Sequence, residues 1–477
     1  MVRIGRKTKI VATLGPASSS LDIIRSLAEA GVDVFRLNFS HGAHDVHKEN
    51  ACSVRKVEKE LGIPLAIMMD IQGPKIRIGT FEDKGVSLLA GAKFTLDLNP
   101  DHGNAMRVCL PHPEIINAII PGTDILLDDG KLKLKAMNND GKSIETVVLE
   151  GGQLSNRKGV EVPGVVLPIN AITERDQADL AIIGEIDADW LAVSFVQTAD
   201  DIECARNIVG PDINVLAKIE KPMALEYIDS IVGAADAIMV ARGDLGVEIP
   251  FESVPHVQKM LVEKAREYCK PCIVATQMLE SMISCHVPTR AEVSDVAYAV
   301  LEGADAVMLS AETASGQYPV EAVKTMAKIV TQAEREPCSF CHTNAASTSS
   351  VAEAVSIMAA KDNIETVVVF TESGRSANVI ANGRPSANIV AFTTSQRAAR
   401  RLCLSWGVTQ IVSDEIFGFS QMIQIVQKNL IQNFDVADDQ KIIIVAGFPF
   451  REPGQTNLIH ICKVGKHSYS RAGEADI

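Results

Sequence analysis

The chain has 477 residues, of which 47% are hydrophobic and 22% are charged, a composition typical of a globular protein rather than a disordered or fibrous one. A typical length of about 150 residues per domain predicts roughly three domains. The formal net charge of -14 argues against nucleic acid or an anionic membrane as the partner.

Targeting signals and cysteines point to an intracellular protein. The N-terminal segment has no apolar stretch long enough for a signal peptide, and no later segment is long enough to span a bilayer, so we expect a cytoplasmic location. Ten irregularly spaced cysteines favour free thiols. Cys338, Cys341 and His342 form a CxxCH pattern, and Cys269 with Cys272 a CxxC pattern. Because haem attachment needs export and Cys272 opens an apolar strand, we expect ordinary thiols at both places.

Eight short apolar runs alternate with helical patterns along much of the chain. They are KIVATLG at 9–15, VDVFRLNFS at 32–40, PLAIMMDIQ at 64–72, WLAVSFV at 190–196, VLAKIE at 215–220, AIMVARGD at 237–244, CIVATQ at 272–277 and AVMLSAE at 306–312. Such runs are typical of strands buried on both faces of a parallel sheet. The spacing of Ile23, Ile24, Leu27 and Ala28 predicts one of the intervening helices, over 21–30. The alternation predicts a (β/α)8 barrel.

Two other segments break this pattern. Between Gly73 and Ile169 short alternating runs such as KFTLDL and SIETVVL are separated by turn residues, which predicts an inserted antiparallel β domain that could act as a lid. After a small, polar link that starts at Cys338, the runs TVVVFT, NIVAFTT, TQIVSD, KIIIVAG and LIHICKV predict a second α/β sheet. We therefore expect a barrel over 1–72 and 170–342, a lid over 73–169 and a C-terminal α/β domain over 343–477.

Charged residues close several of the barrel runs. Lys218 and Glu220 are two residues apart, so on a strand they point to the same side, and Asp244 closes the next run. Two carboxylates from adjacent strands suit Mg²⁺, which is usually held by one or two carboxylates with substrate and water. An internal ion pair between Lys218 and Glu220 is the alternative.

Other polar groups are predicted at the same barrel mouth. Arg36 ends the second run, and Asp70 and Arg77 flank the turn after the third. Arginine binds phosphate oxygens with a planar fork, which indicates a phosphorylated substrate unless these are surface charges. Thr276 ends the seventh run, and Gly243 precedes a helix whose first N–H groups suit an anion. Helix capping is the simpler explanation for each of these taken singly.

The order of longer motifs resembles the pyruvate kinase family throughout. These are KIVATLGPAS, FRLNFSHG, MDIQGPKIR, NRKGVEVPG, AKIEKP, MVARGDLGVEI, ATQMLESM, PTRAEVSDVA and GADAVMLSAETASGQYP. The resemblance is specific over the barrel and lid and looser over the last domain. It implies phosphoryl transfer from phosphoenolpyruvate to ADP, giving pyruvate and ATP in glycolysis, by a homotetramer that uses Mg²⁺ or Mn²⁺.

The resemblance also implies residue roles. Lys218 would stabilise the charge that passes between the phosphoryl group and the enolate, and Glu220 and Asp244 would hold the metal. Arg36 would contact the phosphate. Gly243, Asp244 and Thr276 would contact the substrate carboxylate and its reacting face, while Arg77 and Lys158 would grip the nucleotide. Phosphoryl transfer depends mainly on such positioning and electrostatic stabilisation.

The chain departs from the family at a monovalent-cation site. That site resembles Asn38, Ser40, Asp70 and the backbone of residue 71, but Ile71 stands where potassium-dependent members carry Thr, and Lys75 stands where they carry Glu. A lysine supplies a fixed positive charge itself, so we predict that activity does not require potassium. Met223 also departs from a usually polar position, and we expect little effect from it.

In the last domain, one segment is similar to the effector loop of regulated family members. The loop contains Thr371, Ser373, Gly374, Arg375 and Ser376 between a strand and a helix, a geometry that suits a phosphorylated metabolite. An ordinary helix cap is the alternative.

Two other functions compete with the kinase. One is another metal-dependent barrel enzyme that acts on enolates, against which Lys158 on the lid indicates a second, nucleotide substrate. The other is a metabolite sensor without catalysis, which would be expected to lose Lys218, Glu220, Asp244 or Thr276; all four are present. Glu312 belongs to a family motif, and we expect it to support the barrel mouth rather than to react.

Overall fold

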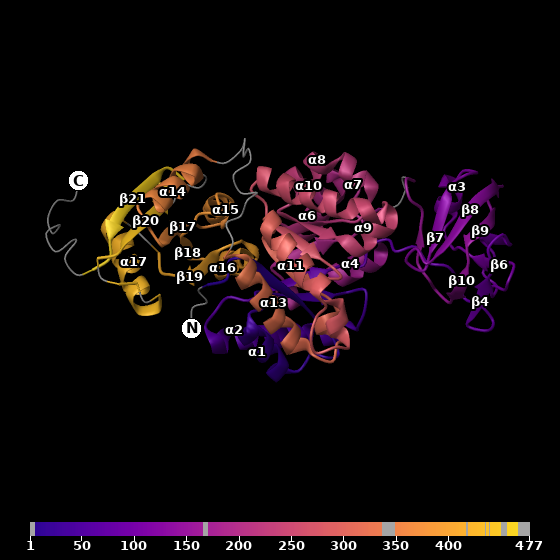
Figure 1. Ribbon diagram of the computed structural model, residues 1–477, viewed down its shortest axis with the longest axis horizontal. Coiled ribbons are helices and arrows are strands. Elements are labelled where there is room, and N and C mark those ends of the chain that lie inside the picture. Colours follow the sequence, from indigo (N-terminus) through magenta and orange to yellow (C-terminus); the bar gives the residue numbers. More distant parts are fainter. Residues whose placement is uncertain are drawn as a thin grey trace.

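Three bodies lie in a row along the long axis of the molecule, with the barrel in the middle (Figure 1). The computed structural model describes residues 5–165, 170–335, 349–415, 418–434, 436–437, 439–449 and 456–465. The inserted β domain lies at one end, joined to the barrel by thin segments, and the C-terminal domain lies at the other end. The predicted CxxCH pattern at Cys338–His342 lies outside the described residues.

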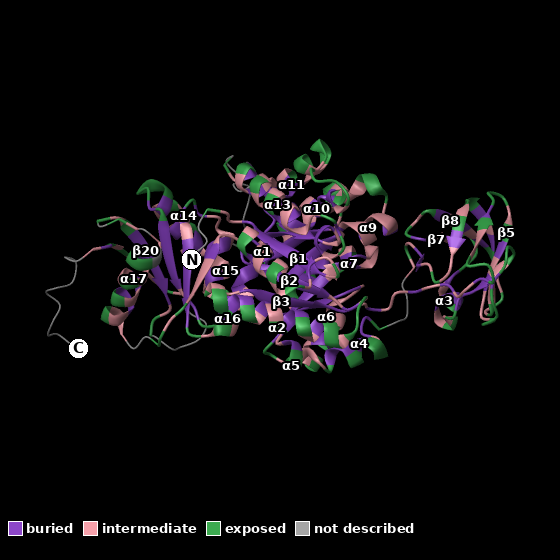
Figure 2. Cartoon of the chain, turned by 90° about the horizontal axis from the view of Figure 1, so that it is seen from below, coloured by how far each residue is buried: buried purple, intermediate pink, exposed green. Residues whose placement is uncertain are grey.

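Each of the eight apolar runs forms one strand of a closed parallel barrel, so this prediction is confirmed. The sheet order is β1-β16-β15-β14-β13-β12-β3-β2. The strands are β1 (Lys9–Leu14), β2 (Val34–Asn38), β3 (Ala66–Asp70), β12 (Trp190–Val193), β13 (Asn214–Ile219), β14 (Ala237–Ala241), β15 (Cys272–Ala275) and β16 (Ala306–Leu309). Figure 2 shows these strands as the buried centre of the middle body. Burial on both faces explains why the runs are continuously apolar.

Helices surround the barrel strands, and most of them bury apolar side chains. They are α1 (Leu21–Ala30), α2 (His44–Leu61), α4 (Glu174–Leu180), α5 (Ile183–Ile186), α6 (Ala199–Val209), α7 (Pro222–Glu226), α8 (Ile228–Ala234), α9 (Arg242–Glu248), α10 (Val254–Glu267), α11 (Arg290–Glu302), α12 (Ala311–Ala314) and α13 (Pro319–Ala333), with 3₁₀ turns η1 (Phe251–Ser253) and η2 (Glu280–Ile283). The helix predicted over 21–30 is confirmed as α1. It begins after Ser20, whose side chain accepts from the Ile23 N–H, and ends at Gly31 with φ 124°.

The inserted domain has its own hydrophobic core and a mostly antiparallel sheet, as predicted. The order of the larger sheet is β11-β7-β8-β9-β5-β6, and β10 pairs with β4 in a second sheet. Its elements are β4 (Gly85–Leu88), β5 (Lys93–Asp97), β6 (Arg107–Cys109), α3 (Pro113–Ala118), β7 (Asp124–Leu127), β8 (Leu132–Asn139), β9 (Ser143–Glu150), β10 (Gly152–Ser155) and β11 (Val160–Glu161). A separate core cluster lets this domain move as a unit relative to the barrel.

The C-terminal domain is an α/β sheet of order β19-β18-β17-β20-β21, in which β21 is antiparallel. Its elements are α14 (Ser350–Lys361), β17 (Thr366–Phe370), α15 (Arg375–Asn382), β18 (Asn388–Thr393), α16 (Gln396–Arg401), η3 (Leu402–Leu404), β19 (Val408–Val412), α17 (Phe419–Asn433), β20 (Lys441–Ala446) and β21 (Leu458–Lys463). The five predicted runs are the five strands of this sheet.

The C-terminal domain packs against the end of the barrel that lies away from the carboxyl ends of the strands. Cys403 and Leu404 of η3 join the core cluster inside the barrel together with Trp190. Arg400 forms a forked ion pair with Glu58 of α2, at 2.7 Å for the closer nitrogen. This domain therefore closes one end of the barrel and leaves the other end for chemistry.

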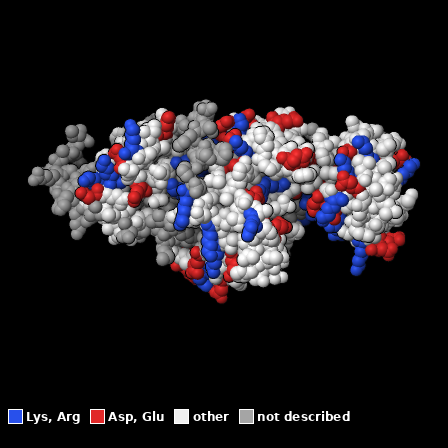
Figure 3. Space-filling view, viewed as in Figure 1, with Lys and Arg blue, Asp and Glu red and all other residues white. Residues whose placement is uncertain are grey.

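Charged side chains of both signs lie on the surface of the molecule. On the face seen in Figure 3, acidic and basic side chains are interspersed rather than gathered into a basic patch. A search of the helices in the described part of the chain finds none with the length and apolar character needed to cross a membrane. The three domain boundaries stated above remain a proposal, supported by the separate core clusters of the barrel, the inserted domain and the C-terminal domain.

Candidate active site

The carboxyl ends of neighbouring barrel strands bring the predicted residues together. Asn38 at the end of β2 is in register with Asp70 at the end of β3, and Asp70 is in register with Ala192 of β12. Lys218 lies one residue before the end of β13. Polar side chains from four successive strands therefore meet at one rim of the barrel, as in other closed β/α barrels.

Lys218 is the centre of this cluster. Its Nζ lies 2.8 Å from Glu220 Oε1 and 3.3 Å from Asp70 Oδ1, and it donates a hydrogen bond to Ser194 Oγ at 2.7 Å. Burial alone would lower the pKa of Lys218, but the two carboxylates outweigh it and raise the pKa above its ordinary value. Lys218 is therefore a permanent cation at neutral pH, suited to stabilising negative charge and unsuited to giving up a proton.

Arg36 and Asp70 form a second buried pair beside Lys218. Arg36 Nε donates to Asp70 Oδ2 at 2.6 Å, and another guanidinium nitrogen donates to Thr13 Oγ1 at 3.1 Å. Burial would raise the pKa of Asp70, but the charges of Arg36 and Lys218 outweigh burial and lower it. Arg36 and Lys218 therefore hold two fixed cations at one point of the barrel mouth, and such cations suit the oxygens of a phosphate.

Glu220 and Asp244 are the carboxylates predicted to hold a divalent metal. Glu220 is buried and accepts a hydrogen bond from the Phe195 N–H at 2.8 Å, and burial and the charge of Asp244 raise its pKa although Lys218 opposes them. The repulsion between the Glu220 and Asp244 carboxylates would be relieved by a cation between them. The described residues contain no cluster of three or more metal-binding side chains, so a metal here would need substrate and water as further ligands.

Thr276 links the end of β15 to the start of α9. Its Oγ1 accepts a hydrogen bond from the Gly243 N–H at 2.8 Å, and Arg242 donates to its backbone carbonyl at 2.7 Å. Thr276 has φ 71°, in the left-handed region that a β-branched residue rarely adopts. Strain held at a predicted site residue is typical of active sites. The Gly243 N–H, predicted to be open to an anion, is occupied by the Thr276 hydroxyl in this structure.

Arg77 and Lys158 lie on the inserted domain and its connection, away from Lys218. Arg77 donates to the Arg157 carbonyl at 3.0 Å, and Lys158 pairs with Asp128 at 2.7 Å. Among the described residues neither side chain contacts the barrel-mouth cluster. This structure therefore shows the inserted domain standing away from the mouth, and bringing the two cations to a shared ligand would require it to swing inward.

The residues of the predicted monovalent-cation site lie together, but Lys75 does not lie among them. The Ser40 N–H donates to Asn38 Oδ1 at 3.2 Å, and the Phe39 N–H donates to the Asp70 carbonyl at 2.9 Å. Lys75 instead extends along Gly159 of the inserted domain. Its Cε lies 3.7 Å from the position that a Cβ would take at Gly159. The charge of Lys75 is not at this site in the present arrangement.

The predicted effector loop leads directly into α15. Thr371 Oγ1 accepts from the Gly374 N–H at 3.0 Å, Gly374 has φ 93°, and the Ser376 hydroxyl lies 2.8 Å from Thr456 Oγ1. Ser373 and Arg375 are exposed. The N-cap residue of α15 is Gly374, which has no side chain to cap the helix, so this geometry does not decide between an effector loop and an ordinary cap.

Sequence reasoning missed several supporting groups. The Ser194 hydroxyl binds Lys218 and donates to the Ile71 carbonyl at 2.8 Å, and Thr13 binds Arg36. Ser194 directly follows β12 in the run WLAVSFV, so the strand-end rule that selected Lys218 could have found it. Glu312 is buried and accepts from the Leu279 N–H at 3.1 Å and the Ser310 N–H at 2.7 Å, which supports the expected structural role.

This fold and this site define a barrel enzyme whose mouth holds the cations Arg36 and Lys218 among the carboxylates Asp70, Glu220 and Asp244, an arrangement that suits an anionic substrate bound with a metal. A family model described as pyruvate kinase, barrel domain, matches residues 5–323, and one described as pyruvate kinase, alpha/beta domain, matches residues 349–462. The chain belongs to the pyruvate kinase family and is a phosphotransferase.

Individual relatives agree with the family models over nearly the whole chain. The chain is 45% identical over 475 residues to the pyruvate kinase of Methylorubrum extorquens, covering 98% of this chain and 99% of the relative. It is 40% identical to that of Geobacillus stearothermophilus, covering 96% and 80%. The crystal structure of a pyruvate kinase from Cryptosporidium parvum superposes with a TM-score of 0.91 at 32% identity, covering 98% of each chain.

Proposed function

We propose that the protein transfers the phosphoryl group of phosphoenolpyruvate to ADP, giving pyruvate and ATP in glycolysis. The observation that carries this proposal is the permanent cation Lys218, held by Asp70, Glu220 and Ser194 at the barrel mouth. Phosphoryl transfer spreads negative charge over the moving group, and fixed cations stabilise that charge without rearrangement. Protonation of the enolate that remains would then give pyruvate.

Arg36 is the residue we propose to hold the phosphate of phosphoenolpyruvate. Its guanidinium is fixed by Asp70 and Thr13, so its orientation is set before the substrate arrives. Lys218 would then face the bridging oxygen. Gly243, Asp244 and Thr276 would receive the substrate carboxylate at the start of α9, which the hydrogen bond from the Gly243 N–H to the Thr276 hydroxyl holds in position. Preorganised donors of this kind lower the barrier mainly by positioning.

Glu220 and Asp244 would hold the Mg²⁺ or Mn²⁺ that the family implies. Their carboxylate oxygens are the ligand type these ions prefer, and the unfavourable influence of Asp244 on ionised Glu220 supports a cation between them. The metal would supply neutralisation of the phosphoryl charge. Glu220 remains anchored by the Phe195 N–H, so its position does not depend on the metal.

Arg77 and Lys158 would bind the nucleotide after the inserted domain closes over the barrel. Both are cations at the edge of this domain, and each is paired at present with a group of the same domain. Closure excludes water and completes the site in enzymes of this kind.

We further propose that catalysis does not require potassium. Asn38, Ser40, Asp70 and the Ile71 carbonyl form the candidate cation site, and closure of the inserted domain would carry Lys75 from Gly159 towards it. A rate in tetramethylammonium buffer within about twofold of the rate with added potassium is expected; a tenfold or greater rise on adding potassium would refute potassium independence.

We also propose an effector site in the C-terminal domain and assembly into a tetramer. The loop around Thr371, Ser373, Gly374, Arg375 and Ser376 would bind a phosphorylated metabolite, supported by the exposed Ser373 and Arg375 at the start of α15. We propose a cytoplasmic homotetramer from the family resemblance. Alanine replacement of Ser373 and Ser376 would abolish activation by sugar phosphates or AMP, and unchanged activation would restore the capping explanation.

The central assay follows pyruvate with lactate dehydrogenase in the presence of phosphoenolpyruvate, ADP and Mg²⁺. Pyruvate formation that depends on all three is expected. Production of pyruvate without ADP would favour a different enolate chemistry, and the lack of any Mg²⁺-dependent signal in the folded protein would favour a sensor.

A further inference from the structure

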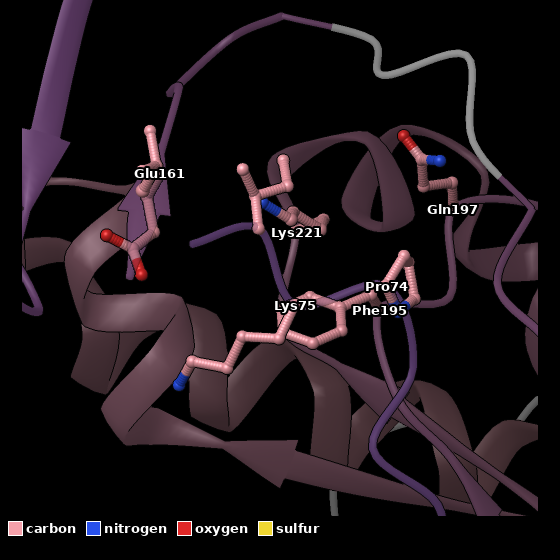
Figure 4. A pocket seen from close by; sticks show the side chains of 8 residues that line it. Pro74, Lys75, Glu161, Phe195, Gln197 and Lys221 are labelled. Carbon is pink, nitrogen blue, oxygen red and sulfur yellow. The ribbon is translucent and has the colours of Figure 1, made fainter. Parts of the chain in front are cut away.

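A small pocket lies where the inserted domain joins the barrel (Figure 4). Its lining combines residues of the inserted domain and its connection with residues of the barrel: Lys75, Val160, Glu161, Phe195, Gln197 and Lys221. Any swing of the inserted domain must change this pocket, because Val160 and Glu161 belong to β11 while Phe195, Gln197 and Lys221 belong to the barrel.

Glu161 is the acidic group in this pocket lining. Its Oε2 is buried and has no hydrogen-bond partner among the described residues. The other oxygen, Oε1, lies against the backbone of Gly159, 2.9 Å from where a Cβ would stand at that residue. Figure 4 shows Glu161, Lys75 and Lys221 reaching into the same region from different elements. Partial burial without a full set of hydrogen-bond partners disfavours the charged form of a carboxylate.

Charged groups of both signs face Glu161 from every element around it. Lys75 on the connection and Lys221 after β13 favour its ionised form, while Asp129 in the β7–β8 turn and Glu248 of α9 oppose it. Lys221 is already paired with Glu248 and lies 5.5 Å from the centre of the Phe195 ring. Burial, reinforced by Asp129, raises the pKa of Glu161 to about 7.

We propose that Glu161 is a positioning residue for the reaction: its charge state sets how readily the inserted domain leaves the present arrangement and closes over the barrel mouth. The pocket in which Oε2 has no hydrogen-bond partner in the described part of the chain is formed by β11 together with Phe195, Gln197 and Lys221. Closure carries Glu161 into water and frees Lys75 from its place along Gly159. This inference rests on the proposed function, in which the inserted domain brings nucleotide contacts to the barrel.

The direction of the pH effect follows from the raised pKa. Protonated Glu161 favours the present arrangement, in which its pKa is about 7. In the closed arrangement, where the side chain would be exposed, its pKa would be near the ordinary 4.5, so the carboxylate ionises there at lower pH. The preference for the present arrangement is therefore lost as the pH rises towards 7. The equilibrium therefore shifts towards the closed arrangement as the pH rises, and this shift levels off above pH 7. With pKa values of about 7 and 4.5 in the two arrangements, the closing equilibrium changes about tenfold between pH 6 and pH 8.

The kinetic test compares the full-length protein with the variant Glu161→Gln, a neutral side chain of the same shape. Between pH 6 and pH 8 the KM for ADP of the unmodified protein should fall about tenfold more than that of the variant. The changes in kcat and in the KM for phosphoenolpyruvate with pH should be the same in the two proteins. Glu145→Gln, which removes an exposed carboxylate from β9 of the same domain, should behave like the unmodified protein. An identical pH profile of the ADP KM in the protein and in Glu161→Gln overturns the proposal.

A second readout does not depend on activity. Amide hydrogen exchange of residues 75–78 and 158–162, measured at pH 6 and pH 8 and corrected for intrinsic exchange, should increase at pH 8 in the unmodified protein and in Glu145→Gln but not in Glu161→Gln. The unmodified protein alone tests the proposal if the variant fails to fold, since equal corrected exchange at the two pH values would overturn it. A pH-dependent hinge in a protein that makes no pyruvate would refute the proposed function and leave the hinge standing.

Discussion

Replacement of Thr276 by valine tests how the barrel mouth is held in position. The Thr276 hydroxyl accepts from the Gly243 N–H at 2.8 Å and donates to the Ala275 carbonyl at 2.6 Å. Valine has nearly the same shape and is also β-branched, so the strain of the left-handed backbone, φ 71°, is the same in both proteins. The change therefore isolates the hydroxyl.

The expected loss follows from the hydrogen bond that is removed. Leaving a partly buried N–H without its partner costs about 1–3 kcal/mol, which is roughly a 5- to 150-fold change in an equilibrium or a rate. Because Gly243 precedes Asp244, we expect the start of α9 to loosen and both kcat/KM for phosphoenolpyruvate and the apparent affinity for Mg²⁺ to fall within this range.

The assay titrates Mg²⁺ and phosphoenolpyruvate in the lactate dehydrogenase-coupled reaction, with thermal unfolding as a check that the fold is intact. Thr276→Ser keeps the hydroxyl and loses only the methyl group, so it should retain most of the activity. The reasoning is wrong if Thr276→Val stays within twofold of the unmodified protein, or if Thr276→Ser loses as much as Thr276→Val.

Three further outcomes are expected. Lys218→Met should lower kcat by about 100-fold or more, because it removes a fixed cation from the developing charge; a decrease below tenfold in a folded protein would contradict this role. Arg400→Met should lower the unfolding midpoint by several degrees, since breaking a buried ion pair costs about 3–5 kcal/mol, whereas Arg25→Met on the α1 surface should leave the midpoint nearly unchanged because water screens an exposed pair; equal effects would refute the difference. Chelation of divalent metal should abolish activity and leave the unfolding midpoint unchanged, because Lys218 and a backbone N–H already hold Glu220; a large drop in the midpoint would show that the metal supports the fold.

The barrel was predictable because its signals are local. A strand buried on both faces must be apolar along its whole length, and a helix that faces a sheet must repeat its apolar residues every three to four positions. Helix α1 illustrates this: the pattern over 21–30, Ser20 before it and Gly31 after it mark both ends. The same reasoning located the strands of the C-terminal sheet, but their spatial order β19-β18-β17-β20-β21 depends on contacts between distant segments.

The site was predictable where a residue stands at a strand end, since all barrel strands end at one rim. Lys218, Glu220, Asp70 and Arg36 were found in this way, and the pairing of Lys218 with Ser194 follows only from the curvature of the sheet. The position of Lys75 could not be predicted, because it depends on where the inserted domain stands relative to the barrel.

The sequence by itself determined the eight strands, the insertion after the third and the identity of the charged groups, because these depend on residue type and short-range spacing. Only the tertiary structure decided that η3 enters the barrel floor, that Thr276 occupies the Gly243 N–H, and that Glu161 lies beside Phe195 and Lys221 at the junction of the inserted domain and the barrel. Each of these contacts joins segments far apart in the chain, and its energy depends on burial and distance, which a linear sequence does not contain.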